Sequence, residues 1–307
     1  MNAVPTDQCS LVHNDSMPSL LTDLRHYYQH RFDSDNYRDT TNYTHSLLTL
    51  KFIMRGEQQF QLDDQRLRVR PNCFLLINPG STIRRLSQPG NDHSSIDILF
   101  PAVLLRGLLK QPSIAFPYLP GSLYEMTPLA TVALHPFVQE VEMKDDEQVY
   151  KAYLGISEVL LYYQQLNASR VHTIKASRLE TKEDLFARLQ QAKAYILSKF
   201  ETIVSIAEIA KACSLSQSLL TKHYAMVFGV SPKQDIIQLK LDYSKQLLQT
   251  TNMQVLDIVT QVGFINPSSF IRLFRSLTGM TPGNYRSSIA DRKQDNYRMQ
   301  TDLVYLS

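Results

Sequence analysis

Between residues 46 and 100 the chain alternates short apolar runs with turn residues. The breaks between the runs include Asp63-Asp64, Pro79-Gly80 and Pro89-Gly90. Runs of this length between turn residues are typical of β-strands joined as hairpins. The pattern therefore predicts a small antiparallel barrel or sandwich.

After Pro101 the apolar positions take helical spacing. We expect a short helix at Val103–Leu109 and a long one at Glu147–Leu166. The long helix has more apolar surface than one face requires, from Val159 to Tyr163, which serves either to pair two subunits or to pack on the chain's own barrel. Residues 167–183 are polar and poor in large apolar side chains, which predicts a linker.

The chain beyond residue 183 is predicted to be helical throughout, and two helix starts are explicit. Ser205 with Glu208, and Ser231 with Gln234, have the spacing of a capping box, in which side chains satisfy the free amides of a first helical turn. Pro232 supports the second start, because its missing N–H costs nothing at the first helical position.

This helical part contains an internal repeat at a spacing of 50 residues. The repeated positions are Leu220, Tyr224, Gly229, Ser231 and Pro232, which correspond to Phe270, Phe274, Gly279, Thr281 and Pro282. Each copy has the order short helix, tight turn, second helix and glycine stop. The repeat therefore predicts two helix-turn-helix units.

The second helix of each unit has an apolar face and an opposite, mainly polar face. Core spacing assigns to the interior Leu220, Tyr224 and Val227 in the first unit and Phe270, Phe274 and Leu277 in the second. The outward stripes are Ser218, Thr221, Lys222 and Ala225, and Ser268, Ile271, Arg272 and Arg275. Hydroxyl, Lys and Arg groups can donate to base edges and phosphates. A solvated face explains any single residue equally well, but the paired arrangement favours double-stranded DNA as the partner.

The net charge of +3 is unevenly distributed. Up to residue 183 there are 18 Lys+Arg against 20 Asp+Glu, and beyond it 14 against 9, so the two parts carry −2 and +5. A basic bias confined to one part is consistent with a nucleic-acid-binding module. The length of 307 residues with 43 % hydrophobic residues fits two globular domains.

The cysteines and the first twelve residues indicate the cellular compartment of the protein. Cys9, Cys73 and Cys213 are far apart, which indicates neither a disulfide framework nor a zinc site. Residues 1–12 contain no Lys or Arg and no apolar segment, so neither export nor membrane spanning is expected. We expect a cytoplasmic protein.

The longest recognisable motif lies in the second unit. It reads Val262-Gly263-Phe264-Ile265-Asn266-Pro267-Ser268-Ser269-Phe270-Ile271-Arg272-Leu273-Phe274-Arg275, followed by Thr278-Gly279-Met280-Thr281-Pro282-Gly283-Asn284-Tyr285-Arg286. This segment resembles the signature of the AraC/XylS family of bacterial transcription regulators, and Ile206-Ala207-Glu208-Ile209-Ala210 is similar to the first unit of that family. The resemblance spans roughly Leu185 to Arg286. It implies a seven-helix DNA-binding domain that reads promoter DNA and activates transcription through contacts with RNA polymerase.

The resemblance also implies roles for individual residues by matching position. Base contacts are expected from Ser218, Thr221, Lys222, Ser268, Ser269 and Arg272. Phosphate contacts are expected from Asn266 and Arg275. The chain departs from the family pattern at Val259, where Ala is usual, at Lys240, where Arg is frequent, and at Ile271, where a small polar residue is common.

For the β segment the resemblance implies a cupin-like barrel that holds an effector or offers an interaction surface. A metal-dependent cupin enzyme needs a His-x-His with a further Glu and His, whereas this segment has only His45 and His93. His26 and His30 have helical spacing but no third ligand nearby, and are expected to be surface residues. No metal, cofactor or catalytic residue is therefore expected.

Arg66, Arg68 and Arg70 alternate along one predicted strand, with Leu67 and Val69 between them. Alternation places the three arginines on one face and the apolar pair on the other. The arginines form either a solvated outer face, which we favour, or an anion pocket for an effector.

The predicted fold is thus α+β with two domains. A cupin-like sensor and dimerisation domain covers residues 1–166, a linker 167–183, an all-α DNA-binding domain with two helix-turn-helix units 184–290, and a tail 291–307. We expect a homodimeric, non-enzymatic regulator that binds promoter DNA and RNA polymerase, has no membrane partner and responds to an unidentified effector. Two alternatives differ in the first domain: a module switched by a protein partner alone, or a cupin enzyme fused to a DNA-binding domain.

Overall fold

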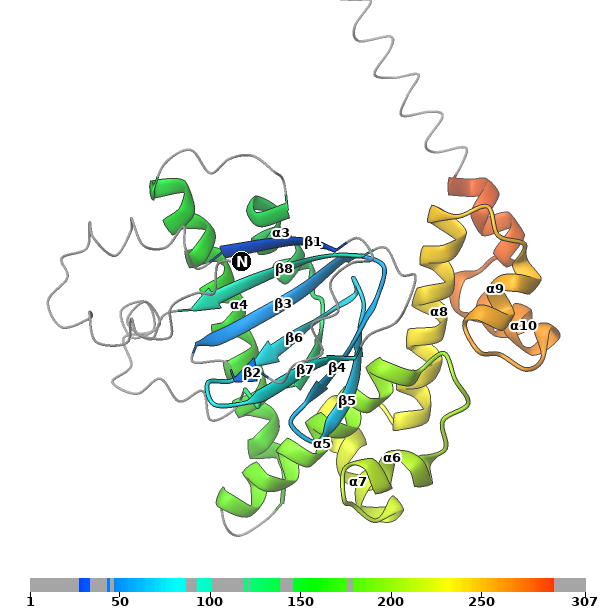
Figure 1. Ribbon diagram of the computed structural model, residues 1–307. Coiled ribbons are helices and arrows are strands. Elements are labelled where there is room, and N and C mark those ends of the chain that lie inside the picture. The colour runs from blue at the N-terminus through cyan, green and yellow to red at the C-terminus, as the bar shows by residue number, and fades with distance from the viewer. Residues whose placement is uncertain are drawn as a thin grey trace, which may run out of the picture. The chain divides into compact units, whose positions relative to one another are not determined.

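The chain forms two compact units in the computed structural model, which describes residues 28–33, 43–44, 47–86, 93–100, 119–120, 122–138, 146–175 and 179–289. The first unit comprises Met1–Ser198 and Met226–Phe228, and the second Lys199–Ala225 and Gly229–Ser307. All the described strands belong to the first unit (Figure 1). The expected helix at Val103–Leu109 and the tail at 291–307 lie outside the described residues.

Two antiparallel sheets build the first unit. Their strands are β1 (Tyr28–Asp33), β2 (Tyr43–Thr44), β3 (Leu48–Arg55), β4 (Gln58–Leu62), β5 (Gln65–Val69), β6 (Cys73–Ile77), β7 (Thr82–Leu86), β8 (His93–Phe100) and β9 (Ser122–Glu125). One sheet has the order β1-β8-β3-β6-β9 and the other β2-β7-β4-β5. The β-rich, cupin-like first domain is confirmed. His30 lies in strand β1 rather than on a helix, and His26 is outside the described residues.

Helices α3 (Pro128–Val138) and α4 (Asp146–Thr173) cover one face of the five-stranded sheet (Figure 1). Leu50 and Phe52 of β3 alternate with residues of the opposite face and pack in one core cluster with Tyr153 and Tyr163 of α4. Burial raises the pKa of Tyr163 to about 12. Much of the apolar surface of α4 is therefore used on its own sheet, although Tyr162 stays 42 % exposed.

The opposite face of the five-stranded sheet meets the four-stranded sheet. Phe60 and Leu67 from the four-stranded sheet and Leu75 from the five-stranded one are buried there. A charge pair lies among them: Lys51 of β3 and Asp97 of β8, which are register partners, form an ion pair although they are 3 % and 4 % exposed. The Lys51 ammonium also lies 5.4 Å from the centroid of the Phe60 ring, so it touches both sheets.

Helices occupy most of the stretch in which the sequence predicts a linker. Helix α4 continues to Thr173 and α5 (Leu179–Lys199) begins six residues later, so the prediction of a linker over 167–183 is wrong at both ends. Val171 and Ile174 are almost completely buried, and this burial extends α4 beyond the polar residues that suggested its end.

Helix α5 packs along strand β5 and strand β9 of the first unit. The Arg68 amide donates to Ser198 Oγ at 2.8 Å, and the Gln190 side chain donates to the Leu123 carbonyl at 3.4 Å. Arg70 is only 4 % exposed; its guanidinium pairs with Glu57 and donates to a carbonyl in the last turn of α5. The prediction of a solvated arginine face is therefore wrong for Arg70, because the end of α5 covers its guanidinium, whereas Arg66 is exposed.

Among the described residues, five helices follow α5, before a last one at residues 282–289. The five are α6 (Ile206–Ala212), α7 (Gln217–Phe228), α8 (Pro232–Thr250), α9 (Val255–Gln261) and α10 (Pro267–Thr278). The order short helix, turn, second helix occurs twice, with α8 between the two copies. The all-α domain with two helix-turn-helix units is confirmed.

Candidate nucleic-acid interface

The first helix-turn-helix unit consists of α6 and α7. Ser205 and Glu208 form the predicted capping box at the start of α6, and the hydrogen bonds from Ser205 lower the pKa of the Glu208 carboxyl. Helix α7 is capped by Ser216, whose hydroxyl accepts from the Leu219 amide at 3.2 Å. Both helices thus begin at side chains that the sequence provides locally.

Helix α8 connects the two units and is anchored to α7. Its capping box of Ser231 and Gln234 is formed as predicted. Asp235 in its first turn is 6 % exposed and accepts a hydrogen bond from the Tyr224 hydroxyl of α7. Because a buried carboxylate without partners is costly, this bond helps to fix α7 against α8.

The second helix-turn-helix unit consists of α9 and α10. Phe270 and Phe274 on the inner face of α10 are fully buried, and their ring centroids lie 5.7 Å apart. The Phe270 ring also contacts Phe264 of the preceding turn, with centroids 5.2 Å apart. Asn266 caps α10, since its side-chain oxygen accepts from the Ser268 and Ser269 amides at 2.9 and 3.2 Å. These rings and this cap hold α10 in place at both its face and its end.

A buried lysine fixes the turn between α9 and α10. Lys240 of α8 donates to the Gly263 carbonyl at 2.5 Å, and its ammonium lies 5.3 Å from the centroid of the Phe264 ring. Burial lowers the pKa of the Lys240 ammonium. Gly263 has φ +75°, and a Cβ atom built there would lie 1.6 Å from the Glu201 carbonyl oxygen. The turn therefore packs directly against the backbone before α6, and only glycine fits.

Each reading helix, α7 or α10, turns its predicted contact residues outward. Ser218, Thr221 and Lys222 are exposed on α7, and Ser268, Ser269, Arg272 and Arg275 are exposed on α10. The Thr221 hydroxyl donates to the Gln217 carbonyl at 2.8 Å and keeps its lone pairs for a further partner. Among the described residues, no ion pair engages Lys222, Arg272 or Arg275, so these cations face solvent.

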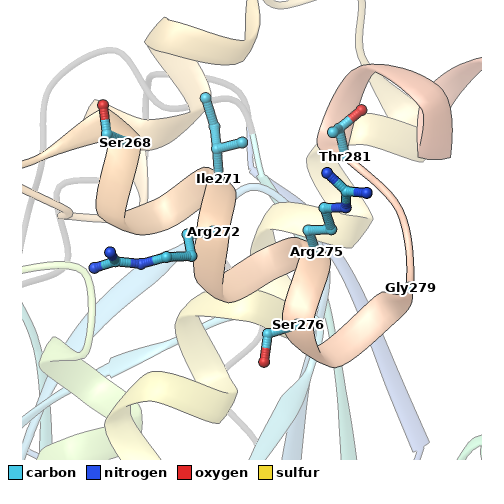
Figure 2. Close-up of a pocket in the computed structure, with 7 residues that line it drawn as sticks. All are labelled: Ser268, Ile271, Arg272, Arg275, Ser276, Gly279 and Thr281. Carbon is cyan, nitrogen blue, oxygen red and sulfur yellow. The ribbon is translucent and has the colours of Figure 1, made fainter.

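The outer face of α10 borders a hollow of about 660 Å³ (Figure 2). The lining residues are Ser268, Ile271, Arg272, Arg275, Ser276, Gly279 and Thr281. In Figure 2, Ile271 projects between Ser268 and Arg275, and the Arg275 side chain extends toward Thr281. The structure thus places three of the four contact residues predicted within α10 around one surface depression.

The structure alters two expectations for the second unit. The side-chain oxygen of Asn266 accepts the hydrogen bonds that cap α10, so only its amide NH₂ group could serve the predicted phosphate contact. Leu277 was expected in the interior but is 57 % exposed, because it lies in the last turn of α10, past the contact between Phe274 and Tyr285. The predicted interior positions Leu220, Tyr224 and Val227 of α7 are confirmed as buried.

Two features of this region were missed in the sequence. Ile265, directly before the cap of α10, is 81 % exposed. His223 on α7 is 7 % exposed, and its Nδ1 has no hydrogen-bond partner among the described residues. Its neighbours Lys222 and Tyr224 gave the only sequence signal, since a residue between an outward lysine and an inward tyrosine lies at the boundary of the two faces.

Comparison with protein families matches both parts of the chain. Residues 209–288 match a helix-turn-helix domain, and residues 26–151 match the AraC-like ligand binding domain. The protein belongs to the AraC family of transcriptional regulators. Its relatives and domains are those of regulators rather than enzymes, so the alternative of a cupin enzyme fused to a DNA-binding domain is not supported.

Curated relatives of this AraC-family chain come from several bacteria. An uncharacterized HTH-type transcriptional regulator of Haemophilus influenzae is 25 % identical over 165 residues, 53 % of this chain and 55 % of that protein. The melibiose operon regulatory protein of Escherichia coli is 25 % identical over 54 % of this chain and 58 % of its own length. The matches thus span about half the length of these relatives. The uncharacterized regulator YfiF of Bacillus subtilis is 21 % identical over 89 % of this chain and 87 % of its own length.

Solved structures similar to this AraC-family chain match either most of the chain or about a third of it. ToxT from Vibrio cholerae is 14 % identical, with a TM-score of 0.34 over 86 % of this chain and 98 % of that one. The DNA-binding domain of AdpA in complex with a target DNA is 21 % identical, with a TM-score of 0.34 over 35 % of this chain and 96 % of that one.

Within the part that the structure describes, no helix has both the length and the apolar character needed to cross a bilayer. Over the same residues, no three His, Cys, Asp or Glu side chains come together as a possible metal site.

Proposed function

We propose that this protein regulates transcription by binding promoter DNA with α7 and α10 in the major groove. The observation that carries the proposal is the pair of capped reading helices whose outward residues are exposed in both copies. Lys222, Arg272 and Arg275 supply cations for base edges or phosphates, and Ser218, Thr221, Ser268 and Ser269 supply hydroxyls. Asn266 and Arg275 are proposed for phosphate, from the edge of α10.

In this proposal the first domain controls the second. We infer a small-molecule effector, because residues 26–151 match a ligand binding domain, in preference to a switch by a protein partner alone. The regulator acts in the cytoplasm as a homodimer and activates transcription through RNA polymerase. The half-exposed residues of α4 around Tyr162 support a subunit contact on that helix.

The DNA-binding proposal is tested with the full chain and a duplex selected from a random library. Affinity is expected to fall steeply with salt, because each neutralised phosphate releases counterions. Arg272→Ala and Lys222→Ala are each expected to lose about 1–3 kcal/mol of specific binding. Lys151→Ala, which removes an exposed lysine of α4, serves as the control and should bind as the unaltered protein does. Retention of full specific affinity by both reading-helix variants would refute the assignment.

The effector proposal has its own test. A metabolite that binds the first domain should raise the unfolding temperature of the full chain and change its affinity for the selected duplex, because binding to one state shifts the equilibrium toward it. A host protein that alone changes DNA affinity, with no metabolite active, would favour the partner switch instead.

A further inference from the structure

The two reading helices differ in chemical character mainly where they face outward. At the buried positions a large apolar or aromatic residue stands in both copies, Leu220 and Tyr224 in α7 and Phe270 and Phe274 in α10. At the outward positions, Thr221 of α7 corresponds to Ile271 of α10, and Ala225 corresponds to Arg275. The two helices are therefore held alike and present different chemistry to DNA.

Ile271 is the one apolar side chain in the middle of the outward stripe of α10. It lies one helical turn from Ser268 and from Arg275, next to Arg272, and all four line the hollow on this face (Figure 2). Its counterpart Thr221 is exposed and hydrogen-bonded to its own helix. An apolar side chain therefore occupies the position where the first unit has a hydroxyl.

The Ile271 side chain is held in a fixed orientation. It is half-buried and packs at its inner side against the cluster that contains Phe270 and Phe274. A side chain branched at Cβ has one strongly preferred χ1 rotamer in a helix. The outer end of Ile271 is thus presented to the hollow without a large loss of side-chain freedom on binding.

The edges of base pairs in the major groove carry donors, acceptors and a single kind of apolar group, the 5-methyl of thymine. We propose that Ile271 is a specificity-determining residue: it contacts the 5-methyl group of one thymine in the half-site bound by α10. Arg272 and Arg275, on either side of it, bind guanine edges or phosphates of the same half-site. The inference rests on the proposed DNA-binding function and adds a base preference to it.

The test removes only the methyl group. The full chain is bound to a duplex selected from a random library, and the half-site of α10 is the part of the footprint weakened by Arg272→Ala. Each thymine in that half-site is replaced by deoxyuridine, one at a time. At one thymine we expect the affinity of the unaltered protein to fall roughly fourfold, the factor given by burial of one methyl group.

Two variants of Ile271, whose new side chains match each other in shape, test whether this side chain makes the methyl contact. Ile271→Val keeps an apolar surface and should retain a thymine preference of at least about twofold. Ile271→Thr keeps one methyl group but places a hydroxyl beside it, as in α7, and should prefer the thymine duplex over the deoxyuridine duplex less than Ile271→Val does. Thermal unfolding followed by circular dichroism verifies that both variants fold.

Three results would overturn the inference. One is specific binding in which no thymine of the half-site responds to loss of its methyl group, and another is a full thymine preference in Ile271→Thr. Both leave the DNA-binding function in place. The third is the absence of specific binding to any selected duplex, which would overturn the proposed function as well.

Discussion

Gly263 provides the sharpest prediction, because another glycine of the same unit serves as its control. Gly263 and Gly279 have nearly equal φ values of +75° and +80°, so an alanine at either position bears the same backbone cost of about 1–2 kcal/mol. Around Gly279 nothing lies within 4 Å of an added Cβ atom, whereas at Gly263 that atom would lie 1.6 Å from the Glu201 carbonyl oxygen.

The added cost at Gly263 is steric. The obstructing atoms belong to the Glu201 backbone, which cannot move aside as the end of a flexible side chain can, and overpacking of this kind costs about 1–3 kcal/mol. Gly279→Ala should therefore destabilise by about 1–2 kcal/mol, and Gly263→Ala by about 2–5 kcal/mol.

The assay is thermal unfolding of the full chain followed by circular dichroism at 222 nm. Since 1 kcal/mol shifts Tm by about 4–8 °C in a unit of this size, Gly263→Ala should melt at least about 4 °C below Gly279→Ala. Hydrogen exchange should locate the loss in α9 and α10, because the displaced turn joins them. Equal Tm values for the two variants would refute the close packing at Gly263.

Two further predictions concern buried charges. Lys51→Met should destabilise the first unit by about 3–5 kcal/mol, because it leaves the Asp97 carboxylate buried without its cation, and Lys51→Met with Asp97→Leu should recover most of that loss; a urea titration in which the double variant is as unstable as the single one would contradict this. Burial and the Lys222 charge lower the pKa of the His223 imidazole, so the unfolded chain takes up the proton first and stability should fall as pH drops below about 6.5. His223→Gln should flatten this part of the stability–pH curve, and an unchanged slope would show that His223 does not cause the loss of stability.

Local patterns explain which parts of this structure could be predicted from the sequence. The capping boxes at Ser205 and Ser231 depend on residues three positions apart, and the strands from β3 to β8 depend on alternation and on nearby turn residues. The cap at Asn266 was not predicted, although an asparagine before a proline has the order of an N-cap followed by the first helical position. The outward residues of α7 and α10 followed from helical periodicity alone.

Contacts between distant residues explain the misses. Arg70 and Leu197 are 127 positions apart, so no local pattern shows that the end of α5 covers Arg70, directly after β5. Helix α4 continues through polar residues because Val171, and Ile174 directly after the helix, are buried in the folded chain. Leu277 has the spacing of a core residue, but the last turn of α10 extends past the aromatic side chains that would cover it.

The contact between α5 and β5 also bears on where the first domain can be separated from the chain. Strand β5 is the last strand of its sheet, and a free strand edge offers its amides and carbonyls to another chain. In the intact protein Ser198 Oγ accepts a hydrogen bond from the Arg68 amide of this edge, and the Leu197 carbonyl at the end of α5 accepts one from the Arg70 guanidinium. A fragment that stops at residue 166 lacks Ser198 and the end of α5, so the edge of β5 is left open to pairing with another chain. A fragment that ends after α5 keeps this edge covered.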